Sequence, residues 1–319
     1  MHFLLPGRRF YKKEMDKPVS DGGYGVFHSY DSERDVHVLT MENMTMTEPI
    51  NIDGWGWSGE IPKVEIVLKG ENVMDTRDQD YGEFHSIIHS GHADVTILSG
   101  EEGSSLAFYG TDCSAITSND GSTTIDGATI TAQCEIGENP EGGQCLNGSS
   151  DYLITGGAEL DLRAGWIGII VSGAVTFEDC TVTTNRIHIH SHVEMDEEGN
   201  VLSTDQQTMT IGEGAVVNIV SAEEGIWGAA LMLLDGSTLK IAGGLLNCDF
   251  RKGPGAQVMV GFDGDCATNT ILIESGEMNV IGSKEQEWQN LMNLDKGRLI
   301  QTGGKLKMKD GNGRDPTGQ

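Results

Sequence analysis

The chain has 319 residues, of which 49 are Asp or Glu and 21 are Lys or Arg, so its formal net charge is −28. Binding to a phosphate backbone needs clusters of Lys and Arg, and the charge balance therefore excludes nucleic acid as the expected partner. The sequence contains no run of about 18 apolar residues, so we expect no membrane-spanning helix. An acidic surface suits solubility, divalent cations and hydrated polymers.

Residues 1–35 show no repeat and contain several aromatic residues, among them Tyr11, Tyr24 and Tyr30. We expect an irregular N-terminal cap here, followed by one elongated domain over residues 36–319. The charged residues at the start follow a short apolar run instead of preceding it, so no secretory leader is visible in this sequence.

From residue 36 onward the sequence repeats at an interval of roughly 30 residues. The clearest motif is a pair of apolar residues separated by one other residue. These pairs are Ile130/Ala132, Leu160/Leu162, Val217/Ile219, Leu246/Cys248, Met278/Val280 and Leu306/Met308. Alternation with a period of two predicts half-buried β-strands.

Two further motifs complete each repeat. One is a short apolar alternation such as Val95–Ile97 or Val175–Phe177, and the other is an apolar stretch that ends in a turn, as in IGIIVSG and ALMLLDG. Three short strands per repeat predict one coil of a parallel β-helix, because a propeller blade needs about 40–45 residues and four strands. We count eight or nine coils. The insertions at residues 135–150 and 196–206 are expected to be loops.

The strings LTMENMTMTEPINIDG, VEIVLKGENVM and STTIDGATITA resemble the right-handed parallel β-helix proteins that gut and other anaerobic bacteria secrete. Some of these proteins are classed as carbohydrate-binding β-helix domains of the pectin-lyase-like superfamily. The resemblance covers most of residues 36–308 in its style of repeat, and it includes no catalytic signature. It implies a right-handed, single-stranded solenoid and a polysaccharide-related role outside the cell or at its surface.

Three tryptophans, Trp166, Trp227 and Trp288, stand at equal intervals, two repeats apart. In a straight stack they would lie about 9.6 Å apart, which is twice the strand spacing of about 4.8 Å. Flat aromatic rings offer an apolar face to sugar rings, so these residues are candidates for carbohydrate binding. The alternative is that all three fill one corner of the core. Trp55 and Trp57, in the Gly-rich segment DGWGWSG, are expected to be exposed and join the candidates.

An aspartate recurs at the turn after the third strand, as Asp235, Asp263 and Asp295. Stacked carboxylates repel one another unless a cation lies between them, so calcium is a possible ligand. Two alternatives stay open. Asp-Gly is also ordinary turn chemistry, and β-helix enzymes use aspartate clusters on neighbouring coils.

The segment RIHIHSHVEM predicts a strand whose apolar residues face inward and whose histidines His188, His190 and His192 face solvent. A transition-metal site on these three histidines is the alternative, because two His at i and i+2 can share one metal.

For two other sets of residues, the sequence favours a structural role. Asn218, Asn247 and Asn279 fall between the paired core residues and are expected to form hydrogen bonds along the stack. Cys134 and Cys145 flank a Gly-rich insertion, which allows either a disulfide or two small buried apolar residues.

The chain carries no recognisable catalytic motif, so whether it is an enzyme stays open. We expect a secreted or cell-surface module that binds polysaccharide or mediates adhesion, with calcium as a possible stabilising ion. The alternative is a polysaccharide lyase or glycoside hydrolase on the same scaffold. The negative charge would repel a polyuronate, which favours binding of neutral or cation-bridged glycans.

Overall fold

The structure, a computed structural model, describes residues 2–5, 8–10, 19–20, 25–53, 61–79, 85–139, 142–196, 201–221, 229–253, 256–261, 267–283, 287, 290–295 and 297–314. Over these residues the chain is all-β, with no α-helix. None of the described segments is therefore a helix of the length and apolarity that a bilayer crossing requires. The chain divides into two compact units, residues 1–166 and 167–319, and each is described by itself.

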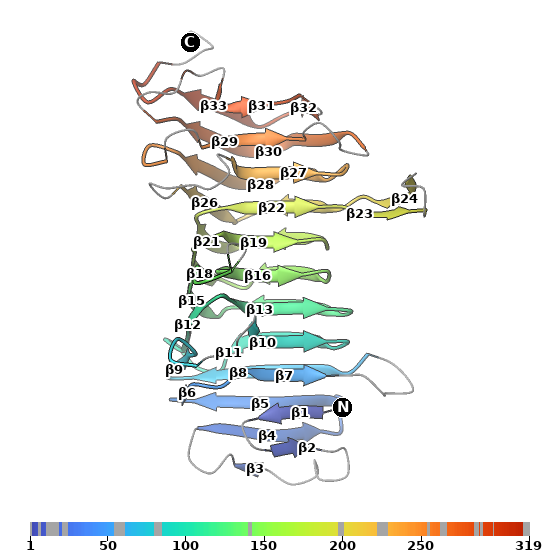
Figure 1. The fold of residues 1–319 in the computed structure, drawn as a ribbon, viewed down its shortest axis with the longest axis vertical. Coiled ribbons are helices and arrows are strands. Elements are labelled where there is room, and N and C mark those ends of the chain that lie inside the picture. Colours follow the sequence, from blue (N-terminus) through green and yellow to red (C-terminus); the bar gives the residue numbers. More distant parts are fainter. Residues whose placement is uncertain are drawn as a thin grey trace. The chain divides into compact units, whose positions relative to one another are not determined.

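In the first unit, parallel strands lie in three rows, and the chain visits the rows in turn (Figure 1). The first row consists of β5 (Val36–Glu42), β8 (Lys63–Lys69), β11 (Asp94–Ser99), β14 (Ser122–Asp126) and β17 (Asp151–Thr155). The second consists of β6 (Thr45–Met46), β9 (Glu71–Asp75), β12 (Ser105–Thr111), β15 (Thr129–Glu135) and β18 (Ala158–Ala164). The third consists of β7 (Ile50–Asp53), β10 (His85–Gly91), β13 (Cys113–Asn119) and β16 (Gln144–Gly148).

The N-terminal segment, expected to be irregular, contains four strands. These are β1 (His2–Leu5), β2 (Arg8–Phe10), β3 (Val19–Ser20) and β4 (Val26–Asp31). β4 runs antiparallel to β5, and β1 runs antiparallel to β7. Antiparallel partners therefore cover the first strand of two of the parallel rows, which leaves those strands without an open edge on that side.

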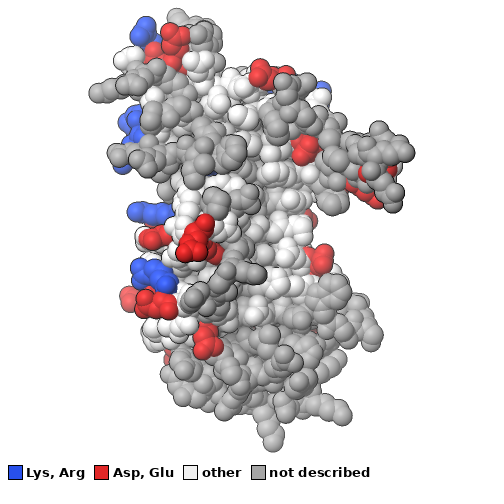
Figure 2. Space-filling model, viewed as in Figure 1, with Lys and Arg blue, Asp and Glu red and all other residues white. Residues whose placement is uncertain are grey.

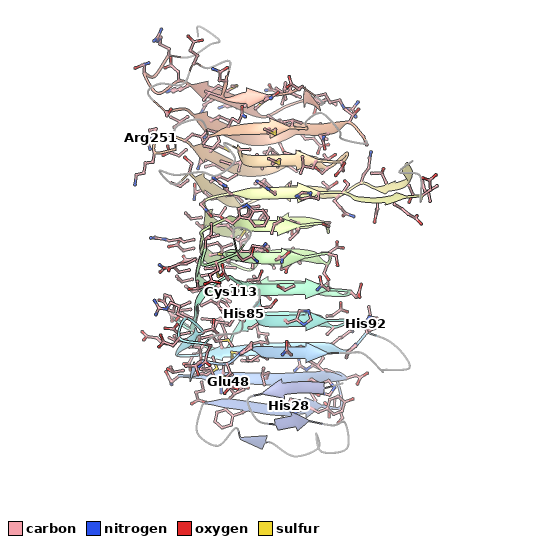
Figure 3. All side chains as sticks on the ribbon, in the orientation of Figure 1. His28, Glu48, His85, His92, Cys113 and Arg251 are labelled. Atoms are coloured by element: carbon pink, nitrogen blue, oxygen red, sulfur yellow. The ribbon has the colours of Figure 1, made fainter. Side chains whose placement is uncertain are left out.

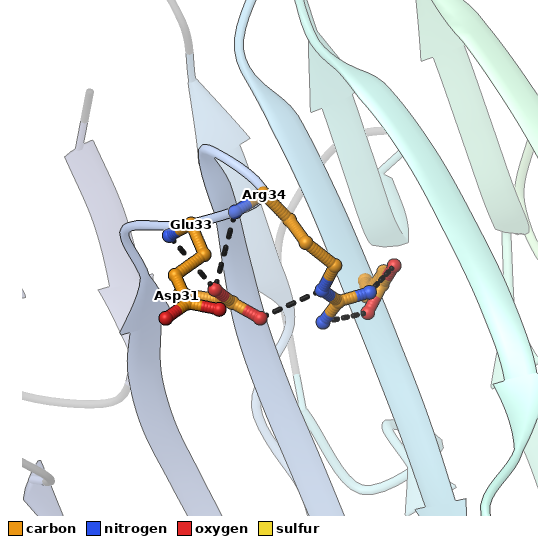
Figure 4. A network of polar contacts seen from close by, with 4 residues as sticks. Asp31, Glu33 and Arg34 are labelled. Atoms are coloured by element: carbon orange, nitrogen blue, oxygen red, sulfur yellow. Dashed lines mark hydrogen bonds and ion pairs between the residues drawn. The ribbon is translucent and has the colours of Figure 1, made fainter.

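Arg34, in the turn between β4 and β5, ties this end to the next strand of the first row (Figure 4). Its Nε donates to Asp31 at 2.6 Å, and its two terminal nitrogens donate to Glu65 at 2.8 and 3.1 Å. Arg34 is about half exposed, so solvent screens both ion pairs. The network fixes the geometry of the turn more than it adds stability.

The second unit also has three rows of parallel strands. The first row consists of β20 (Val175–Phe177), β25 (Thr208–Ile211), β28 (Thr238–Asp249), β30 (Asn269–Ile281) and β32 (Gly297–Gln301). The second begins with β21 (Cys180–Thr184) and β26 (Val216–Val220), continues through the C-terminal halves of β28 and β30, and ends with β33 (Lys305–Lys309). The third consists of β19 (Ile167–Val171), β22 (Ile187–His190), β27 (Ala229–Leu234), β29 (Gln257–Val260) and β31 (Met292–Asn293).

The core consists of the apolar residues that alternate along these strands, as predicted. Val217, Leu246 and Met278 are directly in register on adjacent strands, and each is fully buried. The pairs from β15 through β30 are all buried. Leu306 and Met308, on the outermost strand β33, are only half-buried because the described residues place no strand beyond them. The predicted all-β stack of parallel strands is thus confirmed.

The two insertions predicted to be loops are not simple loops. The first contains β16, which pairs in parallel with β13 and keeps the third row continuous. The second contains β24 (Val201–Asp205), which pairs antiparallel with β23 (His192–Met195) just before the insertion. Strand pairing therefore outweighed the Gly and Asp content of both insertions.

Candidate functional site

A ladder of side-chain amides runs along the outward face of the second row in the second unit. Asn247 Nδ2 donates to Asn218 Oδ1 at 2.9 Å, and Asn279 Nδ2 donates to Asn247 Oδ1 at 2.9 Å. Asn218 Nδ2 extends the ladder toward Thr183 Oγ1 with a long bond of 3.5 Å. The four residues are in register on β21, β26, β28 and β30, so the parallel pairing itself brings them together.

The ladder forms one side of a groove of about 540 Å³. The groove is also lined by a second outward column, which consists of Val220, Asp249, Ile281 and Lys309 on β26, β28, β30 and β33. Val220 is 38% exposed, so an apolar surface is open beside the amides. An amide row flanked by exposed aliphatic side chains presents both hydrogen-bonding and apolar contacts to a ligand.

The charges at this groove are paired. Arg251 Nε donates to both carboxylate oxygens of Asp249 at 2.9 and 3.1 Å, and Lys307 Nζ donates to Glu277 at 2.7 Å. The hydrogen bonds from Arg251 lower the pKa of Asp249, and the one from Lys307 lowers the pKa of Glu277, so both carboxylates are ionised at neutral pH. Arg251 projects outward from this face (Figure 3). Lys309 adds one further basic side chain to the lining, so the groove itself is not acidic although the protein is.

Acidic and basic side chains also lie next to each other in the space-filling view (Figure 2). Three arginines pair with an aspartate two residues earlier on the same strand or just beyond its end. These pairs are Asp75–Arg77, Asp161–Arg163 and Asp249–Arg251. Positions i and i+2 share a face of a strand, which explains why the pairs form. Each of these three arginines is therefore charge-paired within its own strand or just beyond its end.

A second groove, of about 500 Å³, lies at the corner where the strands of the ladder begin. Its floor is a column of glycines, Gly214, Gly243 and Gly276, all with positive φ. A Cβ at Gly276 would overlap the carbonyl of Gly244, so only glycine fits this corner. The glycine corner and the amide groove together make this part of the surface grooved.

Of the tryptophans proposed to bind carbohydrate, the structure describes only Trp166. Trp166 is half-buried, and its backbone N–H donates to Gly143 O at 3.0 Å. Trp55, Trp57, Trp227 and Trp288 lie outside the described residues. The structure therefore decides neither the platform nor the core interpretation, and both stay predictions.

The aspartate ladder is described at two of its three positions. Asp235 is half-buried at the turn after β27 with φ of 56°, and Gly236 follows with φ of 88°. Asp295 is exposed, and its backbone N–H donates to Asn293 Oδ1 at 2.9 Å. Asp263 lies outside the described residues. Within the described residues, no three His, Cys, Asp or Glu side chains are grouped to hold a metal, so calcium stays a prediction.

The prediction that the histidines face solvent is wrong for His188, which is 6% exposed. His190 is half-buried, and the side chain of His192 lies outside the description. Alternation along β22 does direct Ile187 and Ile189 into the core, but the opposite face of the strand is also covered. Burial lowers the pKa of His188 to about 3, with smaller contributions from His190 and Arg186.

Cys134 and Cys145 are free, fully buried thiols, so the structure contains no disulfide between them. Cys113 is their buried neighbour, and it lies in register with His85 of β10 (Figure 3). Hydrogen bonding with Cys134 and burial raise the pKa of the Cys113 thiol. These thiols are therefore small core residues that are protonated at neutral pH.

Sequence reasoning gave the amide ladder a structural role and did not find the groove beside it. The signal was present as one asparagine per repeat, but the depth of the neighbouring column depends on side chains from four strands. Comparisons with protein-family models, with curated proteins and with solved structures found no match to this chain. The resemblance to bacterial β-helix proteins therefore stays a prediction.

Proposed function

We propose that the protein is a right-handed parallel β-helix of eight or nine coils that binds a neutral polysaccharide, outside the cell or at its surface. The observation that carries the proposal is the groove along Asn218, Asn247 and Asn279. Its ligand class is deduced from three properties of the groove, which are its repeat, its chemistry and its charge.

The repeat of the groove suits a polymer. Neighbouring strands in a sheet are about 4.8 Å apart, a length comparable to one sugar residue in an extended chain. Each rung of the ladder therefore meets an equivalent position on a linear glycan. A compact ligand would use only one or two of the rungs.

The chemistry of the rungs suits hydroxyl groups. An amide has two N–H donors and two acceptor lone pairs. Asn247 uses one donor and one lone pair within the ladder, which leaves one of each for a ligand. Sugar hydroxyls both donate and accept, and the aliphatic side chains of Val220 and Ile281 offer surface to the C–H face of a sugar ring.

The charge of the groove favours a neutral polymer. Asp249 and Glu277 are each neutralised by a basic partner, and the chain as a whole carries −28. A polyuronate would be repelled at long range, whereas a neutral glycan would not. Trp166, half-buried in the first unit, is a separate candidate contact, which the same assay examines through Trp166→Ala.

The test is depletion of the protein from solution by insoluble cellulose, xylan, chitin and β-1,3-glucan. We expect the double variant Asn247→Ala/Asn279→Ala to weaken retention on the preferred polymer by at least about tenfold. The control is Thr131→Ala, at an outward position of the second row in the first unit, which should retain wild-type binding. Retention that is unchanged in the double variant would refute the groove as the binding site.

A reducing-sugar assay on the retained polymer separates binding from cleavage. Release of reducing or unsaturated ends by the wild-type protein would replace the binding proposal with the enzymatic alternative. A melting temperature of the double variant close to that of the wild type ensures that lost retention reflects lost contacts and not unfolding.

A further inference from the structure

Three basic side chains project from one face of a single strand in the second unit. Arg186, His188 and His190 occupy alternate positions at and just before β22, opposite the core residues Ile187 and Ile189. The rings of His188 and His190 have centroids 6.3 Å apart. These three side chains belong to the third row of strands, whereas the amide ladder belongs to the second. The inference drawn from them therefore does not depend on the proposed function.

The row is buried and its nitrogens are unsatisfied. Arg186 is 8% exposed and His188 is 6% exposed. Arg186 Nη1, His188 Nε2 and His190 Nε2 are each inaccessible to solvent and have no hydrogen-bond partner. Buried polar groups are nearly always paired, because an unpaired one costs several kcal/mol. Three unpaired nitrogens on one face therefore indicate a ligand.

The side chains beside Arg186 and His188 on the flanking strands do not pair with these two residues. Beside Arg186 lie Gly168 and Ala230, one residue before the register partners of Ile187. Beside His188 lie Ile170 and Met232, both half-buried. None of these four residues has a side-chain oxygen or nitrogen that could accept a hydrogen bond. The outward side of Gly168 is covered by Thr184 and Asn185. The half-buried Ile170 and Met232 are the apolar neighbours of the row.

The charge of the row determines which ligand it accepts. Arg186 stays cationic, although burial lowers its pKa. Among the described residues, the carboxylate that acts on the row is Asp235, and it acts on His190. The guanidinium opposes a metal cation at the neighbouring imidazoles. It attracts a carboxylate, whose two oxygens match its planar fork of N–H donors.

We propose that Arg186, His188 and His190 form a binding site for a carboxylate whose attached body is apolar. The carboxylate accepts hydrogen bonds from Arg186, and the apolar body lies against Ile170 and Met232. The Nδ1–H of His188 donates to the carbonyl of Ala229, which leaves Nε2 directed toward the ligand. His188 takes up one proton from solvent at Nε2 on binding, so that it also donates to the carboxylate. His190, half-buried beside Asp235, lies at the end of the row nearer to solvent.

The test uses titration calorimetry with four probes: sodium hexanoate, sodium benzoate, sodium glucuronate and neutral hexanol. We expect hexanoate and benzoate to bind in a 1:1 ratio, with proton uptake visible as a dependence of the enthalpy on the buffer. Glucuronate should bind at least about tenfold more weakly because its body is polar, and hexanol should not bind. Glucuronate binding as tightly as hexanoate would overturn the apolar part of the proposal.

The matched variants are Arg186→Gln, Arg186→Lys and, as a control, Arg163→Gln. Arg163 is exposed and paired with Asp161 in the first unit, so its loss should leave hexanoate affinity unchanged. Arg186→Gln should lower the affinity at least about tenfold, and Arg186→Lys should recover part of it. Equal affinity in Arg186→Gln and wild type would overturn the site.

Nuclear magnetic resonance of the wild-type protein with labelled histidine avoids any folding defect of the variants. Hexanoate should shift the His188 ring nitrogens to the values of a protonated imidazolium. A ring that stays neutral in the presence of saturating hexanoate, or stoichiometric Zn²⁺ binding that displaces hexanoate, would assign the row to other chemistry and overturn the proposal.

Discussion

Asn279 donates a side-chain hydrogen bond of 2.9 Å to Asn247, although the two residues are 32 positions apart in the sequence. The bond repeats one coil earlier, between Asn247 and Asn218, over 29 positions. Side-chain amides that both donate and accept along a stack resist any slip of one strand against the next. The ladder therefore contributes to the register of the strands as well as to the face beside the groove.

Replacement of Asn247 by Ala removes both of these hydrogen bonds. The ladder is half-buried, and a net hydrogen bond contributes about 1 kcal/mol, so we expect a loss of about 1–2 kcal/mol in the free energy of unfolding. Denaturant titration of Asn247→Ala, Asn279→Ala and the double variant measures the coupling between the two sites. Strictly additive losses would show that the amides act independently and that the ladder has no cooperative role.

The buried histidine row makes stability depend on pH. An unfolded chain binds a proton at His188 near pH 6.5, whereas the folded chain binds it only near the lowered pKa of about 3. The free energy of unfolding should therefore be highest above pH 6.5. It should fall by about 1.4 kcal/mol for each further unit of pH until about pH 3. Burial also lowers the pKa of His190, which adds to the loss in the same direction.

Thermal unfolding in buffers without carboxylates measures this dependence. Between pH 6.5 and 4, the free energy of unfolding of His188→Gln should fall less steeply with falling pH than that of the wild type. The difference between the two slopes should correspond to nearly one bound proton. Parallel curves for wild type and His188→Gln in this window would mean that His188 is protonated or exposed in the folded protein.

The sequence predicted the strands better than their surroundings. One apolar alternation per repeat was enough to place Val217, Leu246 and Met278 in one buried column, because burial on one side of a strand follows directly from period two. The same logic failed for His188. It assumed that the opposite side faces solvent, and only the tertiary structure shows that this side is covered as well.

The two candidate binding sites were also only partly predictable from the sequence. The asparagines at fixed intervals were visible in the sequence, but the groove beside Asn247 depends on how far Val220 and Asp249 stand out from neighbouring strands. Arg186 gave no signal at all. An arginine just before a strand is normally exposed, and only the tertiary structure shows that Arg186 is 8% exposed.

Asp112 binds the part of the first insertion that precedes β16. Its carboxylate accepts backbone N–H groups of Gly137 at 2.7 Å, Glu138 at 2.7 Å and Asn139 at 3.1 Å. Partial burial raises the pKa of Asp112, but these three hydrogen bonds outweigh it and lower the pKa overall. The stability that it adds is therefore fully present above about pH 4 and is lost as the pH falls through the lowered value.

We expect Asp112→Ala to reduce the free energy of unfolding by about 1–3 kcal/mol, because it removes a charged acceptor and places Ala at a φ of 51°. Asp112→Asn should cost less, since Asn tolerates this conformation and keeps one acceptor oxygen. Hydrogen exchange at residues 137–139 should accelerate in both variants. Unchanged exchange there would show that the carboxylate does not hold the insertion in place.

Gly276 and Gly157 form a matched pair that separates backbone strain from steric overlap. Their φ angles are nearly equal, at 77° and 80°. A Cβ at Gly276 would overlap the carbonyl of Gly244, whereas a Cβ at Gly157 meets no atom within 4 Å. Gly157→Ala should therefore cost only the strain of a positive φ, about 1 kcal/mol. Gly276→Ala should cost at least about 1–3 kcal/mol more, because the overlap is with backbone that cannot rotate away. Denaturant titration of both variants measures the difference. Equal losses would mean that the coils around Gly244 relax freely, which is incompatible with a tightly stacked glycine corner beside the proposed binding face.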